Sequence, residues 1–201
     1  MMDYFYAPPE QVRFPRAEMT GEEFNHLVHV MRKKESDEVR VVDGCGTAYD
    51  VVLTSLKNKK ATGKITARLD SHGEPAIHVS IAVGVLKNPS RFDFLVEKAT
   101  ELGAREILPM TTERTISRHA KTERWQKLAL AAMKQCGRSF LPQATELRTL
   151  DQVLESVSLH QVALVCHSGD GNTPSLSTYW DDRSRGFKEG RQQFCPNHHR
   201  T

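Results

Sequence analysis

The sequence predicts an α/β protein in two parts, a small β-barrel followed by an α/β domain with parallel strands. Short strand patterns separated by turn signals fill residues 1–70, which is typical of a small barrel. Residues 71–75 (SHGEP) form a turn-rich boundary without an apolar period. After this boundary strand and helix patterns alternate, as they do in parallel sheets with helical crossovers. We therefore expect domains at residues 1–70 and 76–180, followed by an atypical polar tail at residues 181–201.

The first part contains three predicted strands and one helix. Thr20-Gly-Glu-Glu23 has the pattern of a capping box, in which Thr20 and Glu23 bond each other's backbone amides at the start of a helix. Residues 38–43 and 47–54 flank a turn and predict a hairpin, and residues 63–70 predict another short strand. Several short strands so close together in the sequence suggest a small barrel, because closure of the sheet removes exposed edges.

The second part begins with residues 77–86 (IHVSIAVGVL), a nearly continuous apolar run that predicts a strand covered on both faces. A helix with one apolar stripe is expected over residues 92–102, where Gly103 ends it, and a second strand over residues 105–112. Another amphipathic helix starts at Thr122 and is closed by Gly137. The remaining predicted elements are a short helix over residues 150–157 and a third core strand over residues 161–166.

Positive charge is concentrated in one part of the chain. Residues 87–138 hold 11 Lys and Arg against 6 Asp and Glu, a net charge of +5, whereas the whole chain is +3. Localised positive charge attracts polyanions, of which nucleic acid is the most common.

Several function classes lack support in the sequence. There is no secretory signal and no apolar run long enough to span a bilayer, so we expect a cytoplasmic protein with no membrane partner. The four cysteines lack metal-site spacing, and we expect no metal. The GxGxxG, P-loop and GxSxG patterns of dinucleotide, nucleoside triphosphate and serine-hydrolase sites are also absent.

The second helix of the α/β part has a polar face that is basic only. A structural helix usually mixes charges at i,i+4, so this face suits contact with RNA, although a solvated surface explains it equally well. Two clusters in the first part, residues 32–34 and 57–60, suit RNA too, and for each alone a solvated loop is the better explanation. The candidate RNA-contacting residues are Arg32, Lys33, Arg118, Arg124, Lys127, Lys134, Gln135 and Arg138.

Two loops follow predicted core strands, at the carboxyl ends where open α/β sheets bind ligands. The first contains Thr112 and Arg114, and the second begins with His167, Ser168 and Gly169. Glycines in the second loop would let the backbone approach a nucleotide or cofactor, and a plain surface turn explains them as well.

Two glutamates, Glu97 and Glu101, lie on the polar side of the first helix of the α/β part. Like charges at i,i+4 repel, so we expect an outside cation to offset them, with Arg114 or Arg118 as candidates; ordinary surface glutamates remain the alternative.

Residues 26–50 (HLVHVMRKKESDEVRVVDGCGTAYD) and 97–138, with EKATELG, TERT, RW and A-x-x-Q-x-x-R, resemble the bacterial 16S rRNA (uracil-N3)-methyltransferase family. The resemblance covers about residues 4–166. It implies a PUA-like RNA-binding barrel, a SPOUT-class α/β domain with a C-terminal trefoil knot, S-adenosylmethionine as methyl donor, and a homodimer. The implied substrate is one uridine in the decoding region of 16S rRNA within the small ribosomal subunit.

The resemblance also implies roles for individual residues. Arg114 and Arg138 would hold phosphate or the uracil carbonyls, and Glu101 would act as a base or orient one. Glu101 and Arg114 are the expected catalytic pair. For the cofactor, the expected contacts are Thr112, His167, Ser168 and Gly169.

The resemblance stops near Trp180. Family members continue with a glycine-rich GPEGGF-type loop and a final Leu-Arg-x-Glu-Thr-Ala segment, and neither occurs here. We therefore expect a truncated or frameshifted chain in which the knot is missing. The alternatives to an active methyltransferase are an RNA-binding remnant without catalysis and an unstable product with an exposed sheet edge.

Overall fold

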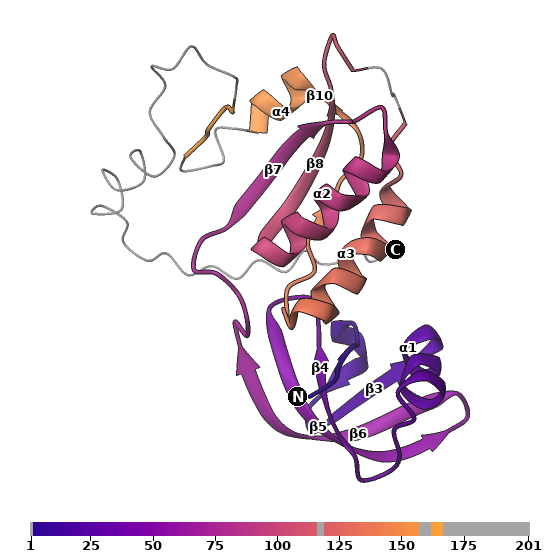
Figure 1. Cartoon of the computed structure of the whole chain (residues 1–201). Helices are drawn as coiled ribbons and strands as arrows, with labels where there is room; N and C mark the ends of the chain where they lie inside the picture. Colours follow the sequence, from indigo (N-terminus) through magenta and orange to yellow (C-terminus); the bar gives the residue numbers. More distant parts are fainter. Residues whose placement is uncertain (1, 116–118, 157–161, 167–201) are drawn as a thin grey trace. The chain divides into compact units, whose positions relative to one another are not determined.

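The computed structural model describes residues 2–115, 119–156 and 162–166. The structure divides after residue 156, and the helices and strands given below all lie before that point (Figure 1). The predicted polar tail lies outside the described residues. Residues 162–166 form no strand, so the prediction of a third core strand is wrong over that stretch.

The N-terminal part is a six-stranded mixed sheet with strand order β1-β4-β5-β6-β3-β2. β1 runs parallel to β4, and the other neighbours are antiparallel. No pairing among the described residues joins β1 to β2, so the described strands form a mixed sheet, and its closure into a barrel stays a prediction. The strands are β1 (Tyr4–Tyr6), β2 (Val12–Arg13), β3 (Arg16–Thr20), β4 (Glu38–Val42), β5 (Thr47–Lys57) and β6 (Lys60–Asp70).

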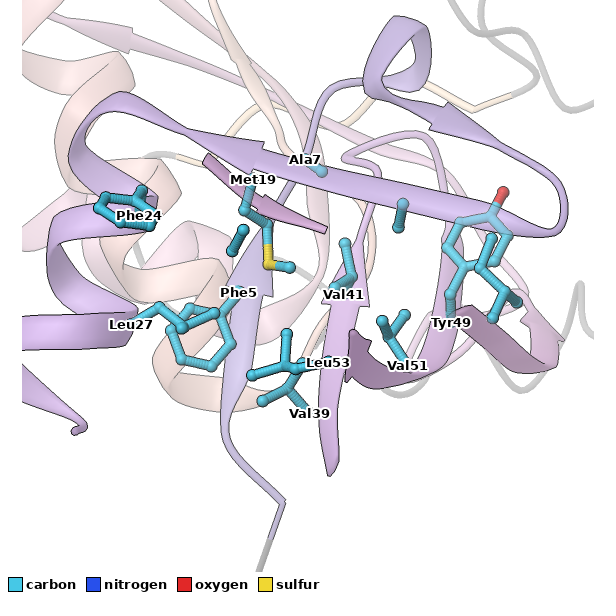
Figure 2. Packing of buried hydrophobic residues seen from close by; sticks show 13 residues of the cluster. Phe5, Ala7, Met19, Phe24, Leu27, Val39, Val41, Tyr49, Val51 and Leu53 are labelled. Atoms are coloured by element: carbon cyan, nitrogen blue, oxygen red, sulfur yellow. The ribbon is translucent and has the colours of Figure 1, made fainter. Parts of the chain in front are cut away.

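The long hairpin β5–β6 is the centre of this sheet and confirms the predicted strands. Its two-residue turn places Asn58 and Lys59 at φ of 55° and 56°, the positive values that the tightest hairpin turns require. Alternate side chains of the sheet point to one side and form a buried apolar cluster there (Figure 2). Large members of that cluster are Phe5, Met19, Leu27, Val39, Val41, Val51 and Leu53.

The helix after β3 is short and is not capped as expected. α1 (Gly21–Asn25) continues as a π-helical turn, η2 (His26–Val30), and the Thr20 side chain makes no capping bond. The Thr20 hydroxyl instead accepts from the Gln11 side-chain amide at 3.2 Å, and the Glu23 carboxylate accepts from the Tyr6 backbone amide at 3.1 Å. The predicted capping box is therefore wrong, because both side chains have partners in other segments.

The second sheet is parallel. β7 (Val79–Gly84) pairs with β8 (Ala104–Thr111), and the short strands β9 (Gln143–Ala144) and β10 (Arg148–Thr149) both pair with β8. Three helices accompany these strands: α2 (Pro89–Leu102), α3 (Thr122–Cys136) and α4 (Leu150–Ser156) (Figure 1). This order confirms the predicted alternation of strands and helices up to α4.

Helices α2 and α3 pack on the parallel sheet through their apolar stripes. The rings of Phe92 and Trp125 lie 4.2 Å apart between centroids, and both side chains are almost fully buried. Each helix ends at a glycine in the left-handed region, Gly103 at φ 101° and Gly137 at φ 73°, as the sequence predicted.

β7 differs from the prediction. Among the described strands it pairs with β8 alone, and it is only half-buried, with Val79 at 39% exposure. The prediction of a strand covered on both faces is therefore wrong for β7 in the described part of the chain. No helix in the described residues is long and apolar enough to cross a membrane.

Candidate functional site

The carboxyl ends of the parallel strands carry the candidate site. β7 ends at Gly84 and β8 at Thr111, and the chain leaves both strands at the same edge of the sheet because they run parallel. The helix α2 starts here with Asn88, whose side-chain oxygen accepts from the Ser90 backbone amide at 3.0 Å, and Pro89 follows at the first helical position. The positive end of the α2 dipole therefore points to this edge.

The loop after β8 is held by its threonines. The Thr112 backbone amide donates to the Thr115 hydroxyl at 2.9 Å, and the Thr115 amide donates to the Thr112 carbonyl at 3.0 Å. The two hydroxyls also lie 3.0 Å apart. Arg114, between them, is exposed, and no ion pair with another described residue occupies it. This loop therefore presents an exposed guanidinium at the end of the sheet.

Arg124, at the start of α3, is at the same end and is already paired. Its guanidinium donates to both carboxylate oxygens of Asp93, at 2.7 and 3.3 Å, and so ties α3 to the first turns of α2. Asp93 is 9% exposed, whereas the Arg124 side chain is 59% exposed. The exposed side of Arg124 is free to face a ligand, but its charge is largely balanced.

Arg138 has a structural role that the sequence analysis missed. Its guanidinium pairs with the Glu74 carboxylate and donates to the Thr100 carbonyl at 2.7 Å. Glu74 also accepts from the backbone amides of Ser139 and Phe140, at 3.0 and 2.8 Å. We call Glu74, Arg138, Ser139 and Phe140 the Glu74 cluster. The Arg138 and Glu74 side chains are 4% and 1% exposed, so the prediction that Arg138 lies on an RNA-contacting face is wrong.

Lys134 is also paired. Its ammonium contacts the carboxylate of Glu23 in α1, and both side chains are largely buried. Lys134 and Gln135, together with Asp3 and Tyr4, line a hollow of about 410 Å³ where α3 meets β1. On the basic face predicted for α3, Lys127 and Gln135 are exposed and have no ion pair with another described residue.

The two expected catalytic residues lie at opposite ends of the parallel sheet. Glu101 precedes β8 and Arg114 follows it, and eight residues of strand span roughly 25 Å. The partner of Glu101 is Lys98 of the same helix, at 2.7 Å, not the expected Arg114. The expectation of a Glu101–Arg114 pair is therefore wrong within one chain, because β8 separates them.

The remaining candidates fall in different places. Lys33 pairs with Asp3 at 2.7 Å, and Arg32 is exposed with φ at 53°. Arg118 and the cofactor candidates His167, Ser168 and Gly169 lie outside the described residues.

For S-adenosylmethionine the described residues supply part of a pocket at most. The Thr112 amide and hydroxyl are already bonded to Thr115. The exposed cation beside them suits phosphate better than a sulfonium, which is itself positive. The described carboxyl end therefore suits a negatively charged group such as phosphate. Sequence reasoning also missed Asn88 at this end, although Asn-Pro after an apolar strand is a helix-start signal.

Comparison with known protein families gives two matches along the chain. A model described as an RNA methyltransferase PUA domain matches residues 19–66, and one described as an RNA methyltransferase domain matches residues 73–185.

Among individual proteins, ribosomal RNA small subunit methyltransferase E of Synechocystis sp. is 30% identical over 174 residues, which is 85% of this chain and 56% of that protein. The Bacillus subtilis protein of the same name is 26% identical, over 82% of this chain and 66% of its own length. The chain thus spans about half to two thirds of these relatives. A crystal structure of the Neisseria gonorrhoeae protein of that name, bound to S-adenosyl methionine, is 28% identical with a TM-score of 0.66, covering 77% of this chain and 65% of that one.

Proposed function

Because the chain belongs to the ribosomal RNA small subunit methyltransferase E family, RNA methyltransferases with a PUA domain, we propose that it methylates N3 of a uridine in 16S rRNA. The proposed donor is S-adenosylmethionine, and the proposed substrate is the small ribosomal subunit in the bacterial cytoplasm. One observation carries the proposal at the site: Arg114 is exposed and has no ion pair with another described residue, on a threonine-braced loop at the carboxyl end of the parallel sheet.

The chemistry explains why such a cation is useful. Uracil N3 carries a proton that must pass to a general base before the nitrogen can attack a methyl group, and the negative charge left on the ring spreads to the carbonyl oxygens. When bound, S-adenosylmethionine supplies the activated methyl. A guanidinium placed beside O2 or O4 would stabilise the charge that develops there. We assign this role to Arg114 without Glu101 as its partner, because Glu101 lies at the other end of β8.

RNA contacts are proposed for those members of the predicted RNA-contacting set that are exposed and have no ion pair with another described residue. These are Arg32 in the N-terminal part and Lys127 and Gln135 on α3. Arg124 joins them through its exposed side, whereas Lys33 and Lys134 would first have to leave Asp3 and Glu23. We also propose an RNA contact by Arg118, cofactor contacts by Thr112 and residues 167–169, and a homodimer. These three proposals rest on the family alone.

The test is transfer of labelled methyl to small subunits that lack the modification, with the full chain. Arg114→Gln is expected to lower kcat by about 10²- to 10³-fold, the loss typical when one donor to a developing negative charge is removed. Glu101→Gln is the matched comparison and is expected to retain activity. Equal losses in both variants would contradict the assignment.

A second candidate is an RNA-binding protein without methyl transfer. The described end of the parallel sheet favours it, because the Thr112 amide and hydroxyl are already bonded to Thr115 and the exposed cation beside them suits phosphate. Calorimetry separates the two functions: heat on titration with S-adenosylmethionine supports the methyltransferase, and RNA binding without that heat supports the second candidate.

A further inference from the structure

The turn between β2 and β3 presents an aromatic ring to solvent. Phe14 occupies this turn and is 77% exposed. A single exposed phenylalanine needs no functional explanation by itself. The residues beside it in the sheet, however, form an arrangement that does not stabilise the fold.

Three cations lie in one row across neighbouring strands beside this turn. Arg13 is directly opposite Arg16 in the β2–β3 pair, and Arg16 is directly opposite Lys64 in the β3–β6 pair. Opposite residues in antiparallel strands share a face, and like charges in such positions repel. All three side chains are exposed, and none has an ion pair or side-chain hydrogen bond with another described residue.

Elsewhere in the same sheet, cations form ion pairs with carboxylates on neighbouring strands. Arg40 is directly opposite Asp50, and the two form an ion pair at 2.7 Å. Lys60, four residues before Lys64 on β6, pairs with Glu18 at 2.8 Å. The unpaired row is therefore a local feature of the Phe14 end of the sheet, and an anion from outside the chain would relieve its repulsion.

An open hollow of about 710 Å³ lies along this row. Its lining includes Arg13, Arg16 and Lys64. Two carboxylates, Glu10 and Glu18, also line it, but Glu18 is already balanced by Lys60. The cations therefore outnumber the free carboxylate, and the hollow favours a negatively charged occupant.

The turn that carries the ring is held in place. The Pro15 carbonyl accepts from the Ile65 backbone amide at 2.9 Å, which fixes the turn to β6. Ala17 and Met19, on the opposite face of β3 from Arg16, are fully buried in the core. A ring on an anchored turn loses little conformational freedom on binding, which favours affinity.

We propose that Phe14, Arg13, Arg16 and Lys64 form a contact site for unpaired RNA. The ring stacks on one unpaired base, and the three cations bind the phosphates that flank it. This inference rests on the proposed function, since it takes RNA as the partner of the chain. It adds a defined site on the N-terminal sheet and a preference for single-stranded over duplex RNA.

The experiment is fluorescence anisotropy of the full chain with a short, unstructured, labelled RNA and with the same RNA in a duplex. Phe14→Ala and Phe14→Leu are each expected to weaken binding to the single strand by about 5- to 150-fold, the contribution of one stacked base. Phe14→Trp is expected to retain affinity. Phe94→Ala is the matched control, because Phe94 is 60% exposed beside Lys98 on α2; it is expected to bind like the wild type.

The cations have a separate readout. Arg16→Gln and Lys64→Gln are each expected to lower the slope of log affinity against log salt concentration by about 0.7, the value for one phosphate contact on a single strand. Arg68→Gln is the control, since Arg68 already pairs with Asp70. All variants are at exposed positions, so unchanged unfolding midpoints verify that the fold is intact.

Two results would overturn the inference while leaving the proposed function standing. One is wild-type RNA affinity in Phe14→Ala. The other is a loss in Phe14→Ala that Phe14→Leu restores, which indicates an apolar contact, as with a protein partner, instead of stacking. If the wild-type chain binds neither RNA nor S-adenosylmethionine, the proposed function fails and the inference fails with it.

Discussion

The two ends of the parallel sheet both carry arginines, and they use them differently. At the amino end, Arg138 is buried and bonded to Glu74 and to the Thr100 carbonyl. At the carboxyl end, Arg114 is exposed on a loop after β8. The difference shows that the position of a cation on a helix or loop does not reveal whether its charge is available. The residue that neutralises Arg138 comes from a segment 64 positions away in the chain.

This comparison leads to an expectation for each end. Charge changes at the amino end should act on the free energy of unfolding, because they leave a buried group without its partner. Charge changes at the carboxyl end should act on ligand binding and catalysis, with little effect on stability. Three changes test the structural side of this contrast.

The largest effect is expected for Glu74→Gln. The substitution keeps the size of the side chain but leaves the Arg138 guanidinium buried without a counter-charge. We expect the free energy of unfolding to fall by about 3–5 kcal/mol, measured by urea denaturation.

The matched control is Asp70→Asn, which breaks the Arg68 ion pair on the surface, where both side chains are more than half exposed. Its expected cost is at most about 1 kcal/mol. Similar losses in the two variants would mean that burial does not distinguish the Glu74 cluster from an ordinary surface pair.

An intermediate effect is expected at the carboxyl end for Asn88→Ala. The change removes the side-chain oxygen that accepts from the Ser90 amide and leaves that donor without its partner. We expect a loss of about 1 kcal/mol in the free energy of unfolding. Asn88→Asp should retain stability, since a carboxylate also caps the helix and suits its positive end. If Asn88→Ala lowered the free energy of unfolding as much as Glu74→Gln does, the two ends of the sheet would not differ in the way expected.

The smallest effect is a pH dependence at the amino end. Burial, and then the nearby Arg40 guanidinium, lower the pKa of His72 below its ordinary value, against weaker opposing effects of Asp50 and Glu74. The unfolded chain then binds a proton more readily than the folded one. Stability contributed by neutral His72 is therefore present above pH about 6.5 and is lost as the pH falls below it.

The measurement compares urea unfolding of the wild type and His72→Asn between about pH 7 and pH 5. The variant should show a shallower decline, and His29→Asn, at an exposed position, should decline like the wild type. Parallel curves for the wild type and His72→Asn would show that His72 does not contribute.

Local patterns predicted much of this fold. The apolar stripes of α2 and α3 and the glycines that end them lie in consecutive sequence, so the periodicity was sufficient to place both helices. Thr20 and Glu23 also matched a local pattern, but Gln11, Tyr6 and Lys134 supply their partners. A capping box cannot be distinguished from these longer-range bonds by spacing alone.

The site was harder to predict for the same reason. The basic face on α3 was read from helical angles, which place Lys134 and Arg138 beside Lys127. Two of these three cations are tied to Glu23 and Glu74, and only the folded chain brings those carboxylates close. The row Arg13–Arg16–Lys64 depends on strand register, which no local pattern in the sequence defines.

Glu74 belongs to neither sheet. It lies in residues 71–75, whose turn-forming composition predicts a simple connector between the two parts of the chain. Its carboxylate nevertheless receives two amides and a guanidinium from the chain just after α3, and the His72 carbonyl accepts from the Ser139 hydroxyl at 2.6 Å. Residues 72–74 are therefore bonded into the α/β domain, and they connect it to the preceding sheet. Anyone grafting a foreign RNA-reading module onto this scaffold should join it before residue 72, because a junction placed later would remove a built-in anchor.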